Sequence, residues 1–592
     1  MIVPRIPHLS YSGALLIPLL IATLSIPGTL PLVFAQEVEE EADPAEITNG
    51  ERLFLETRFA QFFKVFLDGG KTINDPLTEG DPVLDKAVNW KLSPDQFADG
   101  PFSGQSMNCR SCHFVDEIGV EEDGTVDYGM LTYSDFARRS PVPAREDDKT
   151  VTVRNSPPLV NASLPRRDFF LHFDAEFTTM VDLVKGTLTG RNYGWLPGEG
   201  PAAIAHIAKI VREDDGQGEL ASEFEALPYG ILLTGTDPSL PEEFVLPEEF
   251  RVDVANATDE EIFQAVAKLI AAYTEDLAFS QDENGNFNLS PYDVFLETNN
   301  LPRQPEGWES NRSYSKRLLR KIKRLERRGL LQFVTENPNT DNGGFEFHTQ
   351  LFMFGAEELK GLKIFFTQKR HQLQPSDLAD GKTGNCIACH TAPNFTDFQF
   401  HNTGIAQAEY DRTHGPGTFA QLDIPGLWKR FSNHNEFFPA TEQHPQAKEP
   451  FRAIPTTDNP QLTDLGLWNI FFNFDFPKPQ QRIWRGLCKD ALKEPVQGKN
   501  FFQVCNLNRL LTRSIAQFKT PGLRDLSHSA PYSHTGQADT LEGVIRGYIK
   551  NAELQREGEL RNGDRRLKKI ALTEQDIAPL VKFLNSLNED YS

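Results

Sequence analysis

Two short strings of this sequence have residue types and a spacing suited to redox chemistry. They read Cys-Arg-Ser-Cys-His at residues 109–113 and Cys-Ile-Ala-Cys-His at residues 386–390. A covalently attached haem needs two thiols that reach its two vinyl groups, and an imidazole beside the second thiol that binds the iron from one face. Each string supplies all three groups within five residues, so the sequence predicts two c-type haems.

The strings also give each of their residues a role. We expect the thiols to form the bonds to haem and the imidazoles to bind iron, with Cys109, Cys112 and His113 at the first haem and Cys386, Cys389 and His390 at the second. A zinc site would need four ligands in one place, and neither string has a second Cys-x-x-Cys or a His pair nearby. A thioredoxin-type redox pair would leave the histidine after both strings unexplained.

The first 35 residues read as a secretory signal peptide. Arg5 precedes an apolar stretch, and Val-Phe-Ala before Gln36 has the pattern of a cleavage site. The alternative is an uncleaved membrane anchor, which the prolines in the stretch and the acidic run after it disfavour. We therefore expect a mature protein that is periplasmic or otherwise exported.

Two cysteines lie outside the haem strings, Cys488 and Cys505, and they are close together in the sequence. An oxidising compartment favours a disulfide between them that closes a short loop. Two free buried thiols are the alternative.

Charge limits the class of partner. The net charge is −24, and nucleic acid is not expected because phosphate binding needs a basic surface. Such an acidic protein would attract a small basic redox protein, although the charge also serves simple solubility.

Residues 312–328 are basic although the chain as a whole is acidic, with nine basic side chains and an apolar repeat along one face. They predict an amphipathic helix whose basic face is either solvated or a docking surface for an acidic partner.

Helical spacing dominates the rest of the chain and strand signals are sparse, so we expect a mainly α fold with long loops. Thr540 and Thr573 are expected to cap the closing helices. The expected helices cover 50–59, most of 169–190, 259–276, 312–328, 356–366, 540–548 and 573–587, with a loop at 141–164.

Taken in order, these motifs resemble the bacterial dihaem cytochrome c peroxidase and MauG family. The pieces that carry the resemblance, besides the haem strings, are Arg-Asn-Ser-Pro at 154–157, Phe-His-Asn at 400–402, Lys-Thr-Pro-Gly-Leu-Arg at 519–524 and Ala-Pro-Tyr-Ser-His-Thr-Gly at 530–536. The resemblance covers about two thirds of the chain. The stretches that look like enlargements are 195–260, 303–345 and 404–460.

The resemblance implies two cytochrome c-like domains, with a peroxide-reactive haem in the first and an electron-relaying haem in the second. After the signal at 1–35, it places these domains at 36–302 and 346–592, with the basic helix in an insertion or linker at 303–345. It also implies hydrogen peroxide as oxidant, a cytochrome c or cupredoxin as electron donor, and a homodimer as a common assembly.

Two further sites follow from the resemblance. In the family, the second iron ligand of the C-terminal haem lies fourteen residues beyond the histidine of Pro-Tyr-x-His, which is Tyr548 here. A His–Tyr iron has a lower potential than a His–Met iron; the alternative is an ordinary half-buried tyrosine. A calcium ion between the domains would be held by Asn155, Ser529 and Pro531, unless Asn155 only caps a loop.

The chain departs from the family around the first haem. Phe173 stands where the family has a tryptophan between the haems, and phenylalanine is much harder to oxidise. Leu183 and Tyr193 stand at the positions of the family's distal Gln and Glu, so the usual acid is missing. The substitutes that we consider, each with a structural role as the alternative, are His172, Glu176, Arg191 and Tyr193.

These residues support three functions. The leading one is a periplasmic peroxidase-type oxidoreductase that reduces hydrogen peroxide or uses it to oxidise a protein partner. Its first iron is expected to be open, because Gly129 stands where some relatives have a closing histidine. The second function is a dihaem oxygenase of an organic substrate, and the third is a non-catalytic electron carrier with both irons closed by side chains.

Overall fold

The fold is mainly α, as the sequence predicts. Within the described residues, the named strands form two short antiparallel pairs, β1 (Glu117–Val120) with β2 (Val126–Leu131) and β3 (Phe400–His401) with β4 (Phe518–Lys519). The computed structural model describes residues 43–75, 108–113, 117–120, 126–131, 139–140, 142, 145–166, 168–217, 219–338, 340, 342–345, 350–493 and 500–589, so the predicted signal peptide lies outside them. No helix in these ranges is long and apolar enough to cross a membrane.

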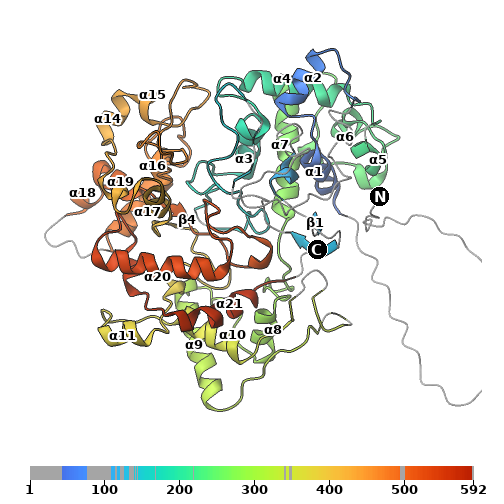
Figure 1. Cartoon of the computed structure of the whole chain (residues 1–592). Coiled ribbons are helices and arrows are strands. Elements are labelled where there is room, and N and C mark those ends of the chain that lie inside the picture. Colours follow the sequence, from blue (N-terminus) through green and yellow to red (C-terminus); the bar gives the residue numbers. More distant parts are fainter. Residues whose placement is uncertain are drawn as a thin grey trace, which may run out of the picture.

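A first hydrophobic cluster surrounds α7 (Asp259–Asp276), against which α1 lies in Figure 1. Thr258 and Glu261 form a capping box that fixes the start of α7. Its apolar residues recur at helical spacing and are buried, which holds the surrounding helices to it. These helices are α1 (Ala45–Leu55), α2 (Gln61–Asp68), α3 (Met180–Leu188), α4 (Gly200–Glu213), α5 (Glu219–Glu223) and α6 (Tyr229–Thr234).

A second cluster is built around α10 (Ala356–Phe366) and α21 (Ile577–Asn585). Gly361 lets these helices touch, because a Cβ there would lie 1.9 Å from the Pro579 carbonyl oxygen. Side chains of α8 (Pro291–Thr298) belong to this cluster, so the break in packing precedes residue 291, whereas the predicted first domain extends to residue 302. The other helices of this part are α9 (Asn311–Arg327) and α11 (Pro375–Asp380).

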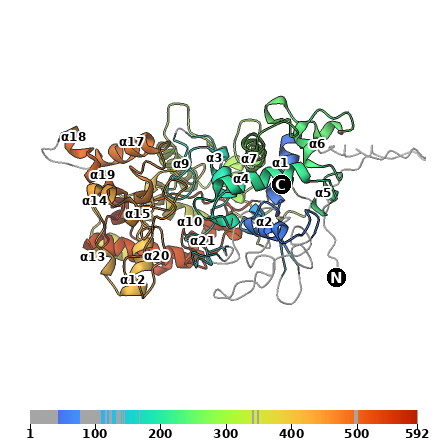
Figure 2. The same cartoon turned by 90° about the horizontal axis from the view of Figure 1, so that it is seen from above.

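A third cluster fills the opposite end of the molecule, seen on the left in Figures 1 and 2. Phe170, Phe173 and Ala175 from the N-terminal half pack into it, so residues near the first haem string and residues of the C-terminal half share one core. Cys488 and Cys505 form a disulfide here. The helices of this end are α12 (Ile405–His414), α13 (Thr418–Gln421), α14 (Leu427–Ser432), α15 (His434–Phe437), α16 (Leu467–Ile470), α17 (Gln480–Ala491), α18 (Phe501–Val504) and α19 (Leu507–Ser514), with α20 (Leu541–Glu557) running beside them.

The predicted helix over most of 169–190 is wrong for its first half. Helix α3 covers only its end, starting at the cap Thr179. His172 and Ala175 have left-handed backbone conformations with φ of 57° and 70°, which a right-handed helix does not contain. Leu171 and Phe177 pair across this turn instead. The loop carries three of the residues predicted around the first haem.

The other helix predictions differ mainly at their ends. The bounds over 259–276 and 356–366 match α7 and α10, and Thr540 caps α20 as expected, although α20 continues to Glu557. The helix expected at 50–59 starts earlier and ends at Leu55. The helix expected at 573–587 opens with a 3-10 turn at Glu574–Asp576 and becomes α-helical at Ile577.

Candidate functional site

The first haem string forms one turn that gathers its three chemical groups. Cys109–Ser111 is a 3-10 turn, and the N–H groups of Cys112 and His113 donate to the Cys109 carbonyl at 3.2 and 3.0 Å. Both cysteines are free of disulfides and pack against the first cluster. The turn therefore presents two thiols and an imidazole together, as haem attachment requires.

Burial keeps Cys109 and His113 of the first string neutral. It raises the pKa of the Cys109 thiol to about 11, even though the hydroxyl of Tyr193 lies 3.3 Å from that sulfur. Burial likewise lowers the pKa of His113 to about 4. A neutral imidazole is the form that binds iron, so His113 fits the predicted role.

The second string repeats this turn at Cys386–Ala388. The N–H groups of Cys389 and His390 donate to the Cys386 carbonyl at 3.1 and 2.8 Å. The His390 Nδ1 atom lies 2.9 Å from the Phe395 carbonyl, to which its N–H donates. This bond fixes the ring and leaves Nε2 for a metal, which is how iron-binding histidines are usually oriented.

Tyr548, the predicted second ligand, lies on α20 beside the second string. Burial raises the pKa of its hydroxyl, and the nearby sulfurs of Cys389 and Cys386 raise it further. The ring is half-buried against a small apolar group of Ala552, Leu560, Leu567 and Ile570. A phenolate would be unfavourable in this setting without a cation, and an iron bound by His390 would supply one.

A buried ionic group lies against the second string, and its central residue was predicted only as part of a motif. His401 places Nδ1 2.7 Å from Asp564 and Nε2 3.0 Å from Asp397. Burial lowers the pKa of His401, but Cys389 and these two carboxylates outweigh it, and the pKa is raised well above its usual value. His401 is therefore a buried cation that neutralises two half-buried carboxylates next to Cys389.

The structure separates the four distal candidates of the first haem. His172 Nδ1 lies 2.9 Å from the Glu176 carboxylate, and His172 is close enough to His113 to lower its pKa. Arg191 instead donates two hydrogen bonds of 2.8 Å to Asp147, and Tyr193 lies at Cys109. His172 and Glu176 thus pair with each other beside the first string, Tyr193 contacts the string itself, and Arg191 is paired elsewhere.

Sequence reasoning missed Arg452, which holds Glu176. Its guanidinium pairs with Glu176 and, at 3.1 Å, with the fully buried Asp174. Burial raises the pKa of Glu176, but Arg452 and then His172 outweigh it, so the pKa is held well below its usual range. Arg154, from the Arg-Asn-Ser-Pro motif, completes the network with a 2.7 Å ion pair to Asp174.

Aromatic rings continue from Phe173 toward the C-terminal half. The ring of Phe173 lies 6.1 Å from that of His534, which stacks on Phe518 at 3.5 Å. The Arg154 guanidinium lies over Phe518. Burial lowers the pKa of His534 to about 3, so this histidine stays neutral. The position that the resemblance predicts between the haems is therefore packed with the rings of Phe173, His534 and Phe518, none of them a tryptophan.

Asn155 joins the two halves at the predicted calcium site. Its Nδ2 group donates to the Pro531 carbonyl at 2.6 Å, and its backbone N–H donates to the His534 carbonyl. Its Oδ1 atom is buried and has no hydrogen-bond partner, while the Ser529 hydroxyl donates to the Leu526 carbonyl. An orphaned amide oxygen beside a backbone carbonyl fits a hard cation, and calcium stays a prediction.

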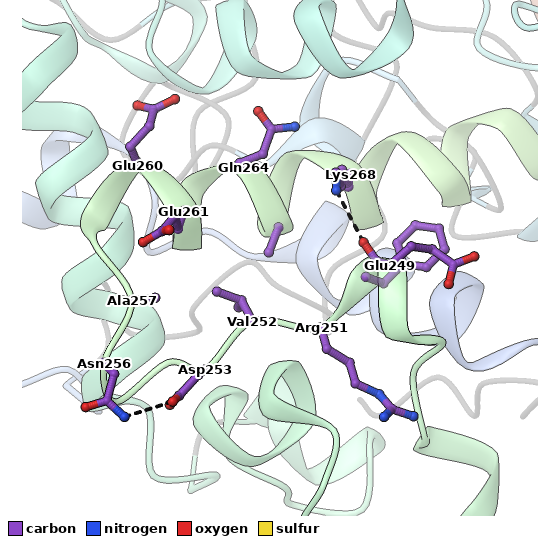
Figure 3. A pocket seen from close by; sticks show the side chains of 12 residues that line it. Glu249, Arg251, Val252, Asp253, Asn256, Ala257, Glu260, Glu261, Gln264 and Lys268 are labelled. Carbon is purple, nitrogen blue, oxygen red and sulfur yellow. Dashed lines mark hydrogen bonds between the residues drawn. The ribbon is translucent and has the colours of Figure 1, made fainter.

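An open pocket of about 560 Å³ lies beside α7 and is unrelated to these strings (Figure 3). Its lining mixes apolar residues with charged ones such as Glu260, Glu261 and Lys268, and it is lined by no cysteine or histidine. It contains none of the predicted site residues.

Comparison with known proteins supports the resemblance seen in the motifs. No family model matches the sequence. The chain is 24% identical over 212 residues to cytochrome-c peroxidase IdrP1 of Denitromonas iodatirespirans. This match covers 36% of this chain and 38% of that protein. It is 37% identical over 73 residues to methylamine utilization protein MauG of Methylorubrum extorquens. This match covers 12% of this chain and 19% of that protein. The chain is similar in sequence to cytochrome c peroxidase and MauG.

These curated cytochrome c peroxidase and MauG relatives are matched over about two fifths and one fifth of their own lengths. Solved structures of similar proteins include a MauG-like protein associated with microbial copper homeostasis, with a TM-score of 0.38, 14% identity and 95% of each chain covered. Another is the diheme peroxidase BthA of Burkholderia thailandensis, with a TM-score of 0.39 and 15% identity. This match covers 93% of this chain and 87% of that chain.

Proposed function

We propose that this chain is an exported c-type dihaem oxidoreductase that reduces hydrogen peroxide with electrons from a small redox protein. The observation that carries the proposal is the pair of Cys-x-x-Cys-His turns, one with its histidine oriented by a backbone carbonyl and the other beside the pair His172 and Glu176. Haem, when bound, supplies the redox-active iron at which peroxide takes up electrons. The remaining argument concerns what the chain's own side chains do.

At the first string, the side chains handle protons. Reducing hydrogen peroxide to two molecules of water takes two electrons and two protons. Arg452 keeps the Glu176 carboxylate ionised, so Glu176 accepts the Nδ1–H of His172. The His172 Nε2 atom is then free to accept a proton from peroxide and to return it to the departing oxygen. In this proposal His172 is the catalytic base and acid, and Glu176 is a positioning residue.

The backbone of His172 supports this assignment. A non-glycine residue at a φ of 57° costs about 1–2 kcal/mol, and such strain persists where the surrounding structure holds it. Here the pairing of Leu171 with Phe177 and the hydrogen bond between His172 and Glu176 hold the turn. The Phe177 ring and the imidazole pack edge to face, with centroids 5.0 Å apart. The imidazole is therefore fixed in one orientation beside the first string.

At the second string, α9 offers a place for an electron donor to dock. The Ser315 hydroxyl accepts a 3.2 Å hydrogen bond from the N–H of Ala392, two residues beyond His390. Burial and then Arg566 lower the pKa of Arg312, and Cys389 acts on it in the opposite sense. The start of the basic helix therefore lies beside the second Cys-x-x-Cys-His string.

The exposed face of α9 is basic although the protein is acidic. Tyr314, Leu318 and Ile322 bury its apolar face. Of its cations, Arg317 pairs with Glu309, but the exposed basic residues include Lys316, Arg320, Lys321, Lys323 and Arg324. Such a surface would steer an acidic cytochrome c or cupredoxin toward the second haem. We therefore favour an acidic donor over the basic one that the net charge alone would attract.

A steady-state assay on the matured, haem-loaded protein tests the proposal. We expect hydrogen peroxide to oxidise a reduced acidic cytochrome c or cupredoxin in this protein's presence, with two donor molecules consumed per peroxide. The proposal would be contradicted if peroxide neither changed the haem spectrum nor drove oxidation of the donor. A stable complex with dioxygen in place of a reaction with peroxide would favour the oxygenase.

A further inference from the structure

Two histidines and an aspartate meet outside both haem strings, beside the third cluster. His434 opens α15, His444 follows it in the 404–460 enlargement, and Asp475 lies beyond α16. One nitrogen from each histidine and one carboxylate oxygen all lie within 4.8 Å of one another. Nothing in the peroxidase proposal uses these residues.

The spacing of these atoms matches that of ligands around one ion. His444 Nδ1 lies 2.9 Å from Asp475 Oδ2, and His434 Nε2 lies 3.3 Å from the same oxygen. Ligand atoms at about 2.0–2.2 Å from a tetrahedral or octahedral metal are about 3.0–3.5 Å apart. The two imidazoles are also stacked, with ring centroids 3.7 Å apart, so one ring must turn out of the stack for both nitrogens to bind the same ion.

A second observation concerns His434 alone. Its Nε2 atom is buried and makes no hydrogen bond, although the Asp475 oxygen is within ion-pair distance. The contact is close but is not aligned as a hydrogen bond. A buried polar atom without a partner costs about 1–3 kcal/mol, and a metal ion between the two atoms would remove this cost.

The residues around the cluster hold its ligands in place. The Thr441 hydroxyl donates to Asp475 Oδ2 at 2.8 Å, and the same hydroxyl oxygen accepts a 3.2 Å hydrogen bond from the N–H of His444. Such secondary contacts are usual around metal ligands. The nearby cation Arg430 would oppose a metal, but its guanidinium is bound by the Trp468 and Phe471 carbonyls.

We propose that His434, His444 and Asp475 form a site for a divalent first-row transition metal, with zinc as the expected ion. Two imidazoles and a carboxylate suit zinc and its neighbours, whereas calcium and magnesium prefer oxygen ligands alone. Three protein ligands leave one position of a tetrahedral ion for water. The bound ion would join α15 to the segment after α16 and so brace the enlargement.

Calorimetric titration of the haem-loaded, chelator-treated protein with zinc tests this site. We expect one zinc ion per chain, a loss of affinity of at least tenfold in Asp475→Asn, and loss of binding in the double variant His434→Ala with His444→Ala. His371→Ala is the matched control, because His371 lies 3.2 Å from Asp377 without a second histidine in that pair, and it should bind zinc like the wild type. Equal zinc binding by the double variant, or none by the wild type, overturns the proposal.

X-ray absorption at the zinc edge of the wild-type protein keeps the test valid if the variants fold poorly. We expect nitrogen and oxygen donors at about 2.0–2.1 Å with the scattering pattern of two imidazoles. A spectrum without imidazole scattering would overturn the site. Because this edge does not report on iron, the result is independent of whether the peroxidase proposal holds.

Discussion

His172 Nδ1 lies 2.9 Å from the Glu176 carboxylate, four residues further along the same loop. The loop does not hold this pair in place alone. Arg452, which is 276 residues away from Glu176, pairs with the carboxylate and keeps it ionised. The acid–base pair at the first haem string therefore depends on a residue from an enlargement in the other half of the chain.

If His172 moves the peroxide proton, its removal should slow the reaction and leave haem attachment intact. We expect His172→Ala to lower kcat by about 10²–10⁴-fold. Glu176→Gln should cost about ten- to a hundredfold, because the amide holds the ring but no longer favours its protonated form. The measurement is peroxide turnover at saturating donor.

Glu199→Gln is a matched control for the glutamate, since Glu199 pairs with Arg145 in the same half of the chain. It should keep wild-type kcat. An unchanged kcat in His172→Ala would show that the proton is handled elsewhere.

Tyr548 should set the potential of the second haem. Replacing it with methionine, Tyr548→Met, should raise that potential, because a thioether favours the ferrous state and a phenolate favours the ferric state. An optical redox titration measures the change. Tyr532→Phe is the control, because Tyr532 donates its hydroxyl hydrogen to the Leu526 carbonyl and has no predicted role at the iron. Equal potentials for Tyr548→Met and the wild type would mean that Tyr548 is not a ligand.

Reversing charge on α9 should weaken the docking of an acidic donor. We expect Lys316→Glu with Arg320→Glu to raise KM for that donor about tenfold or more at low salt, with a smaller effect at high salt. A small uncharged electron donor should be used as well as by the wild type. The same charge change at Lys209 and Lys268, exposed lysines of α4 and α7, should leave KM unchanged. If both double variants affect KM equally, donor docking follows net charge and not α9.

His401 should stabilise the second haem region in a pH-dependent way. His401→Gln leaves Asp397 and Asp564 without this cation, and we expect a loss of about 3 kcal/mol in the free energy of unfolding at pH 6. The folded pKa of His401 is raised, so its contribution is full below its unfolded pKa of about 6.5 and is lost as the pH rises through the folded pKa. Denaturant titrations of both proteins at several pH values measure this difference. A difference that grows with pH would contradict the assignment.

The sequence predicted what depends on local chemistry. Apolar spacing located α7 and α10, and Thr540 was expected correctly as the cap of α20, because helix starts and buried faces are encoded within a few residues. The loop around His172 was misread as a helix, because its apolar residues follow a spacing that the left-handed residues interrupt. Nothing in the local sequence marks those residues as left-handed.

The candidate site was likewise predictable only where its residues are close together in the sequence. Each haem string is contiguous, so its turn could be expected from five residues. Arg452 could not be found, because its pairing with Glu176 spans 276 residues and depends on how the third cluster packs. His401 belonged to a recognised motif, but its two carboxylates come from separate segments, and Asp564 is 163 residues away.

The account depends most directly on covalent haem, which can be counted. The matured protein, denatured and separated by electrophoresis, should stain for haem, and its intact mass should exceed that of the chain starting at Gln36 by two haem groups. Cys386→Ala with Cys389→Ala should reduce the count to one. A mass without any added haem would contradict the account at its base.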